Sequence, residues 1–598
     1  MMGEDYPAQS AMEKEIVTAQ LSQVGVGEVT NTFGLSSCKK ILYKRATSRV
    51  LKRRAMVFLV VIFLAVVLIP SVTNAEPSQW ESVGEGIEYR VYYLDDPNIV
   101  YVTRMDRQNP NVTIETSIAL GKLSSGLETM SNQAKRYDEA LNNWGQALIP
   151  HETGGWGARN QVVVAINGTF TLFPGSQQPW EGQVHSGWYA WRFQDTATRN
   201  AFTWKLDRSV FIGDCVRHPA GKQLVHYTIS NTQEITGINE TRGDDELILY
   251  TPQYDRDTKT DDSGVEVLVE MTNPTLINHP EQAVGTVREI RSGQGSTLIP
   301  FDHVVLSAAG TAANQLESSV QVGTQIGISQ FIRNCDSEST LDWSNTFASI
   351  VSNDFYFLKD GQYQYNSDLG ANVRNPRTAV AYNEHYVYFI VVDGRYPERS
   401  IGMTIEHLAD FSKNLLQADH GLSLDGGGSS TMVVNGEVKN FPSDGVPGSA
   451  VVSGLEDKHL IRDLSRTRTL IESPDSSLIF LPVLQNNYPI DIGDPPPYPI
   501  VERGVPNGLM MVVILPKEQS SGFQAGDDVV VQVSGNANLR LGPGTNYHVI
   551  DSIPNATSGF VLDPTNALNG VRAKGYYWWK VNFGNLDGWM AGTLLSSP

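Results

Sequence analysis

The sequence has little cysteine and no surplus of basic residues. It contains three cysteines among 598 residues, Cys38, Cys215 and Cys335, and its formal net charge is −20 at pH 7. Three cysteines are too few for a disulfide scaffold or a cysteine-based zinc framework. Nucleic acid is bound by a basic surface, so the acidic balance excludes it as the main partner. The 40% share of hydrophobic residues is that of a soluble globular protein.

Long hydrophobic runs are also scarce, and the longest covers residues 55–69. This run is short for a transmembrane helix, which needs about 20 residues. A basic cluster precedes it and the small residue Ala75 follows, a pattern typical of a secretory signal. We therefore expect a basic extension over 1–54 and a signal peptide or signal anchor over 55–75. The protein would be secreted or associated with the envelope, and would contact the membrane only through an uncleaved segment.

Export would carry Cys215 and Cys335 into an oxidising compartment. There they could pair with each other or remain as two buried free thiols, and the sequence leaves both alternatives open.

Composition divides the remaining chain into three stretches. Residues 76–472 form the candidate catalytic domain, an α+β fold that is mostly β, with helical spacing of apolar residues only near 127–144 and 405–416. Residues 473–523 are dense in proline, which predicts an extended linker that few contacts cross. Residues 524–598 show short alternating runs with Gly and Asn turns, which predict a small all-β barrel.

One stretch combines an acidic residue with a run of glycines. The apolar residues 422–424 end at Asp425, three glycines follow (426–428), and then come Ser429, Ser430 and Thr431. Glycine tolerates unusual backbone angles and lets a ligand approach the main chain closely. By itself this pattern equally describes a glycine-rich turn with a capping aspartate.

Two other apolar runs also end in polar residues. Residues 161–166 lead to Asn167, and residues 386–392 lead to Asp393, with Arg377 and Arg395 nearby. Carboxylates can protonate a glycosidic oxygen or activate water, and guanidinium groups bind phosphate oxygens. The set suits a substrate that joins a sugar to a phosphate; two structural Asp–Arg pairs are the alternative. The tryptophans of the middle region could stack on sugars, although packing is their commoner role; they are Trp180, Trp188, Trp191 and Trp204.

These motifs resemble the phosphodiester glycosidase family. The matching segments are VVVAINGTF (162–170), IPFDHVVLSAAG (299–310), NPRTAVAY (375–382), VVDGR (391–395), IGMTIEHLADF (401–411), LSLDGGGSSTMVVNGEV (422–438) and NFPSDG (440–445). The resemblance implies hydrolysis of a sugar such as N-acetylglucosamine from a sugar-1-phosphodiester, at the bond between the anomeric carbon and oxygen. It implies catalysis by Asp425 and Asp393. The implied substrate-binding residues are Asn167, Arg377, Arg395, Gly426, Gly427, Ser429, Ser430, Thr431 and Asp444.

The sequence departs from the family in places and leaves other functions open. An Arg-Pro-Val-Ser-Asn-like ending looks replaced by residues 449–453, which lack arginine. No ligand spacing demands a metal, so a divalent cation near Asp393 or Asp425 is neither required nor excluded. The alternatives are a phosphodiesterase that breaks the P–O bond and a non-catalytic glycan-binding or structural protein of the envelope.

The C-terminal stretch is similar to bacterial SH3-type domains. The matching features are Asn538-Leu539-Arg540, Gly542-Pro543-Gly544, Tyr547, Trp578-Trp579 and Gly588-Trp589. The resemblance implies binding to a cell-wall or other envelope polymer. A structural appendage without a ligand is the alternative.

Overall fold

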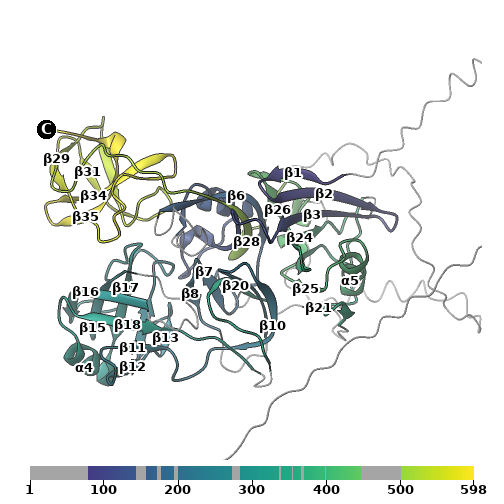
Figure 1. The fold of residues 1–598 in the computed structure, drawn as a ribbon, viewed down its shortest axis with the longest axis horizontal. Coiled ribbons are helices and arrows are strands. Elements are labelled where there is room, and N and C mark those ends of the chain that lie inside the picture. The colour runs from purple at the N-terminus through teal and green to yellow at the C-terminus, as the bar shows by residue number, and fades with distance from the viewer. Residues whose placement is uncertain are drawn as a thin grey trace, which may run out of the picture. The chain divides into compact units, whose positions relative to one another are not determined.

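Five β-sheets and a few short helices make up the described part of the chain (Figure 1). The computed structural model describes residues 79–142, 157–171, 177–193, 199–272, 283–335, 339–352, 355–364, 370–397, 399–445 and 500–598. The predicted signal segment at 55–75 and residues 449–453 lie outside these ranges. Among the described helices, none is both long and apolar enough to cross a membrane.

The first sheet contains two of the predicted polar strand ends. Its strand order is β1-β2-β3-β24-β23-β25-β21-β22, with bounds Glu81–Gly84, Ile87–Leu94, Asn98–Asp106, Tyr386–Val392, Arg377–Tyr382, His420–Ser423, Tyr356–Lys359 and Gln362–Tyr363. β24 and β23 are buried along almost their whole length. Helix α5 (Ile405–Asn414) lies beside β21 and β25 (Figure 1). Thr404 caps α5 by accepting the backbone N–H of His407, which confirms the predicted helix start.

The second sheet corrects part of the predicted linker. Its order is β27-β26-β6-β28-β4, with bounds Glu437–Val438, Met432–Val434, Ala158–Asn167, Asn507–Leu515 and Val112–Ile118. β28 lies inside the stretch expected to be a linker, yet it pairs with β6 on one side and β4 on the other. The local proline content suggested an extended spacer, whereas the apolar run of β28 is buried as an inner strand.

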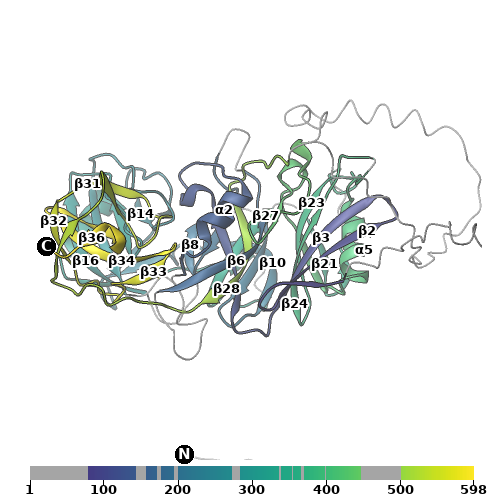
Figure 2. The same cartoon turned by 90° about the horizontal axis from the view of Figure 1, so that it is seen from above.

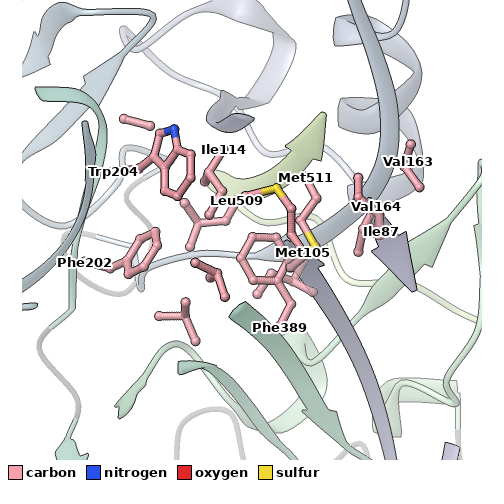
Figure 3. Packing of buried hydrophobic residues seen from close by; sticks show 14 of the residues in the cluster. Ile87, Met105, Ile114, Val163, Val164, Phe202, Trp204, Phe389, Leu509 and Met511 are labelled. Carbon is pink, nitrogen blue, oxygen red and sulfur yellow. The ribbon is translucent and has the colours of Figure 1, made fainter. Parts of the chain in front are cut away.

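A shared hydrophobic core joins these two sheets (Figure 3). Met105 and Phe389 come from the first sheet, and Val164, Leu509 and Met511 come from the second. All five side chains are fully buried. Burial of a large apolar side chain stabilises the fold by roughly 1.5–3 kcal/mol, so β28 is held by its core contacts as well as by its ladder.

The helix expected near 127–144 is shorter in the structure. Helix α2 covers Met130–Tyr137, with Thr129 as its N-cap, and the chain then pairs with β6 through β5 (Leu141–Asn142). Figure 2 shows α2 lying against β6. The apolar positions after Tyr137 continue the helical spacing, but pairing with β6 takes them into a strand.

Two further sheets follow β6 in the chain and confirm a middle region that is mostly β. One has the order β19-β10-β9-β20-β7-β8, with bounds Arg333–Asn334, Val210–Arg217, Arg199–Lys205, Thr346–Ser352, Gln183–His185 and Trp188–Trp191. The other has the order β12-β11-β18-β16-β15-β17-β14-β13, with bounds Thr232–Glu234, Leu224–His226, Gln325–Ser329, Ala283–Ser292, Val265–Met271, His303–Ala308, Leu247–Tyr250 and Gly237–Ile238. Helix α4 (Gly310–Ser319) follows β17.

The two cysteines that were expected to be exported pair with each other. A disulfide joins Cys215 in β10 to Cys335, which follows β19. It connects positions 120 residues apart, and so resolves the alternative between a pair and two free thiols.

The C-terminal sheet is antiparallel. Its order is β31-β30-β35-β34-β32-β29-β36, with bounds Val549–Pro554, Asn536–Arg540, Leu586–Ala591, Tyr576–Phe583, Ser558–Val561, Asp528–Val531 and Leu595–Ser596; β33 (Val571–Ala573) pairs with β34. It has a hydrophobic cluster of its own, which includes Val531, Leu539 and Val581.

Candidate functional site

Asn167 draws the ends of three strands together. Its amide Nδ2 donates to the carbonyl oxygen of Asp425 (2.6 Å), and its Oδ1 accepts from the Thr378 hydroxyl (2.7 Å) and the Thr431 backbone N–H (3.1 Å). Asn167 is fully buried. It therefore holds the loop after β25 in place, and a contact with substrate stays a prediction.

In the glycine loop after Asp425, other parts of the chain lie too close to the backbone to leave room for side chains. Gly427 has a φ of +65°, and its N–H donates to the carbonyl of Pro376 (3.0 Å). A Cβ on Gly426 would lie 2.7 Å from that same oxygen, and a Cβ on Gly428 would clash with Asp444 Oδ1. These contacts explain why three glycines occur here, as the sequence suggested.

The hydroxyl residues after the glycines are buried, which the sequence did not show. Ser429, Ser430 and Thr431 are each 1% exposed. The Ser430 carbonyl accepts from Asn440 Nδ2 (2.9 Å), but Ser430 Oγ has no hydrogen-bond partner within the described residues. A buried hydroxyl without a partner costs about 1–3 kcal/mol, so Ser430 is the hydroxyl here with an unfilled hydrogen-bonding capacity.

Asp393 is buried, and its carboxylate contacts the segment that begins at Asn440. Its carboxylate accepts from the Tyr101 hydroxyl (3.1 Å), Asn440 Nδ2 (3.1 Å) and the Phe441 backbone N–H (3.0 Å). Burial raises the pKa of Asp393 to about 7, and these hydrogen bonds oppose the shift. Asp393 thus anchors the segment that leads to Asp444, and its direct role in catalysis stays a prediction.

The Arg377 side chain is buried and donates hydrogen bonds to backbone carbonyls. It is 5% exposed. Its Nε donates to the carbonyl of Met403 (2.9 Å), and its Nη2 donates to the carbonyls of Gly370 and Val373 (both 2.8 Å). The buried guanidinium fastens the turn before β23, and its phosphate-binding role stays a prediction. Spacing alone could not tell which way the side chain points from its strand.

Two other arginines lie beside the glycine loop. Arg395 is exposed, has a φ of +62°, and donates from Nη2 to Asn375 Oδ1 (3.3 Å). A Cβ on Gly427 would lie 3.1 Å from this Nη2. Arg503 pairs with Asp444 through Nε (2.7 Å) and Nη2 (2.9 Å), directly over Gly428. Predicted Arg395 and unpredicted Arg503 thus border the same loop.

Arg503 was missed because it falls inside the predicted linker. Arg503 lies four residues before β28 begins. The detectable signal was the sequence ERGVPNGLMMVVIL (502–515), in which an arginine precedes a long apolar run.

The segment around Arg503 is held rigidly. The Glu502 carboxylate accepts the Ser131 backbone N–H (2.9 Å) in the first turn of α2, where negative charge is favoured. Gln133 Nε2 donates to the Val505 carbonyl (3.0 Å), and Asn507 Oδ1 accepts the Thr169 backbone N–H (2.9 Å). Arg503 therefore projects from a fixed backbone.

Trp180 and Glu181 lie next to the segment that follows β6. The Trp180 N–H donates to the carbonyl of Phe170 (2.8 Å), and its Nε1 donates to Glu181 Oε1 (2.8 Å). Glu181 is buried with a φ of +64°, which is unusual for a residue with a side chain. Among the other tryptophans, Trp188 and Trp204 are fully buried core residues, which leaves Trp180 and Trp191 partly exposed.

The described residues contain no group of three or more His, Cys, Asp or Glu side chains arranged to hold a metal ion.

Comparison with known proteins agrees with the motifs. Residues 282–455 match the sequence profile of the phosphodiester glycosidase family. The N-acetylglucosamine-1-phosphodiester alpha-N-acetylglucosaminidase of Bos taurus is 30% identical over 125 residues, 18% of this chain and 23% of the relative. The Homo sapiens enzyme of the same name is 28% identical over a match of the same length and coverage. The chain thus spans about a quarter of the length of these curated relatives.

Solved structures show low similarity. A hypothetical protein from Synechocystis aligns over 73% of this chain and 64% of its own, with 14% identity and a TM-score of 0.41. The catalytic domain of the zebrafish N-acetylglucosamine-1-phosphodiester alpha-N-acetylglucosaminidase, auto-inhibited by its pro-peptide, covers 62% of this chain and 78% of its own. Its identity is 13% and its TM-score is 0.27.

Proposed function

We propose that this chain is a hydrolase that releases a sugar such as N-acetylglucosamine from a sugar-1-phosphodiester. The observation that carries the proposal is a single loop that has a carboxylate at its start and two arginine side chains beside it. Asp425 begins the loop, Arg395 lies against Gly427, and Arg503 lies over Gly428. The family match and the printed activity of the curated relatives support the same substrate class.

The charges fit cleavage on the sugar side of the bond. Loss of the sugar leaves a phosphomonoester, which carries more negative charge than the diester. Arg395 and Arg503 would stabilise that growing charge more in the transition state than in the ground state. The sugar develops positive charge, which the Asp425 carboxylate would stabilise. Asp393 acts by positioning the 440–445 segment.

The position of an oxygen-18 label in the products shows which bond breaks. In oxygen-18 water, cleavage between the anomeric carbon and oxygen places the label in the sugar. Label in the phosphate would refute the proposal and favour a P–O phosphodiesterase. Asp425→Asn should lower turnover roughly a hundredfold or more, and its lack of labelled product serves as the control against contaminating enzymes. If the wild type bound the diester but released no product, a glycan-binding protein would be favoured.

We also propose that the protein is exported, with cleavage near Ala75. The support is the Cys215–Cys335 disulfide, because such bonds persist in oxidising compartments. N-terminal sequencing of the protein from the culture medium or envelope tests this. A species that keeps Met1 in the membrane fraction would indicate an anchor.

A further inference from the structure

The connection into the C-terminal sheet is bound along its length. Gln519 forms a β-bridge with Val571, and Ser520 N–H donates to the Gly570 carbonyl (2.8 Å). Glu518 pairs with Arg572 (3.0 Å) and also with Arg159 of β6 (3.3 Å). The chain therefore passes from β28 into the C-terminal sheet without a free tether, unlike the predicted linker.

A phenylalanine from the loop before β17 is inserted among the aromatic residues of 524–598. Phe301 precedes β17 and is 1% exposed. Its ring centre lies 5.6 Å from that of Tyr547 and 5.7 Å from that of Trp589, and its N–H donates to the Leu541 carbonyl (3.1 Å). Phe301 belongs to one hydrophobic cluster with Trp578 and Trp589. Tyr547 and Trp589 are two of the residues that suggested an SH3-type domain.

Polar contacts frame this insertion. Asn566 Nδ2 donates to Asp302 Oδ2 (3.0 Å), next to Phe301. On a separate side, Lys574 Nζ donates to the carbonyls of Lys135 (2.7 Å) and Asp138 (2.5 Å) at the end of α2. A cation is favoured at this end of a helix, where backbone carbonyls lack partners. Residues 524–598 thus contact both α2 and the loop before β17.

We propose that residues 524–598 are an internal clamp whose Tyr547–Trp589 face binds Phe301 of the same chain, in place of an envelope polymer. The clamp joins the sheet that contains β17 to the sheet that contains β28. Arg503 precedes the first residue of β28, and the clamp holds the other end of that strand, near Leu515. This role corresponds to the alternative in which residues 524–598 are a structural appendage without a ligand.

Hydrogen–deuterium exchange of the full chain tests the clamp. Phe301→Ala should speed exchange at least about tenfold in peptides covering 299–303 and 541–548, because local opening then loses its main apolar contact. Phe560→Ala is the matched control, since Phe560 is 42% exposed on β32, and it should leave both peptides unchanged. Asn566→Ala, a milder change, should raise exchange in the 299–303 peptide by a smaller factor.

Three results would overturn the clamp. The first is wild-type exchange at 299–303 that is already as fast as in an unprotected peptide. The second is an equal response to Phe301→Ala and Phe560→Ala. The third is release of the 299–303 peptide when purified peptidoglycan is added to the wild type, which would show that polymer competes with Phe301. None of these readouts depends on catalysis, so failure of the clamp is distinguishable from failure of the proposed hydrolase.

Discussion

Replacing Asp393 by asparagine should change how stability depends on pH. The pKa of Asp393 rises from 3.8 to about 7 on folding because the carboxyl is fully buried. The folded state therefore holds a proton that the unfolded state has released between pH 4 and 7. The stability from Asp393 is fully present below pH 4 and is lost as pH rises through about 7. At about 1.4 kcal/mol per pKa unit, the loss amounts to roughly 4 kcal/mol.

Urea unfolding of wild type and Asp393→Asn from pH 4 to pH 8 measures this effect. The difference in unfolding free energy, wild type minus variant, should fall by up to roughly 4 kcal/mol across that range. Asp342→Asn is the control, because hydrogen bonds from Ser344 lower the pKa of Asp342 to about 2. Its contribution is lost only as pH falls below about 4. A wild-type minus Asp393→Asn difference that stays constant with pH would refute the reasoning.

Three further predictions concern the site and the disulfide. Arg503→Lys should lower kcat/KM on a sugar-1-phosphodiester by roughly 10- to 100-fold, because a lysine cannot reproduce the fork held by Asp444; an unchanged kcat/KM would remove Arg503 from the site. Gly428→Ala should lower activity similarly, since its Cβ would displace Asp444. Gly535→Ala is its control, because a Cβ there meets nothing within 4 Å and the backbone φ is not positive; thermal stability and turnover are compared. Removing the disulfide with Cys215→Ala and Cys335→Ala should cost about 2–4 kcal/mol in urea unfolding, and reduced wild type should match the double variant.

The glycine loop and the strands that lead into it were predictable from sequence because their signals are local. The apolar run before Asp425 is buried as β25 and the residues after it. The Asn435-Gly436 turn joins β26 to β27, with both residues at positive φ. Such patterns depend on backbone preferences over a few residues, so they need no knowledge of distant partners.

The burial of the polar side chains could not be predicted in this way. Asn167 ends β6 and Asp393 follows β24 as expected, and Arg377 begins β23. Each of these side chains is nevertheless buried and bonded within the protein. Whether a strand-end group faces a ligand or the interior depends on which elements cover it. Sequence spacing does not contain that information.

The sequence by itself determined the strand ends, the glycine loop and the start of α5, since each follows from neighbouring residues. Only the tertiary structure decided that Arg503 reaches Asp444, which lies 59 positions earlier in the chain. It also decided that Phe301 fills the Tyr547–Trp589 face. The physical reason is that inner strands and buried aromatic rings are selected by the apolar area they cover together, and that area exists only once distant segments have packed.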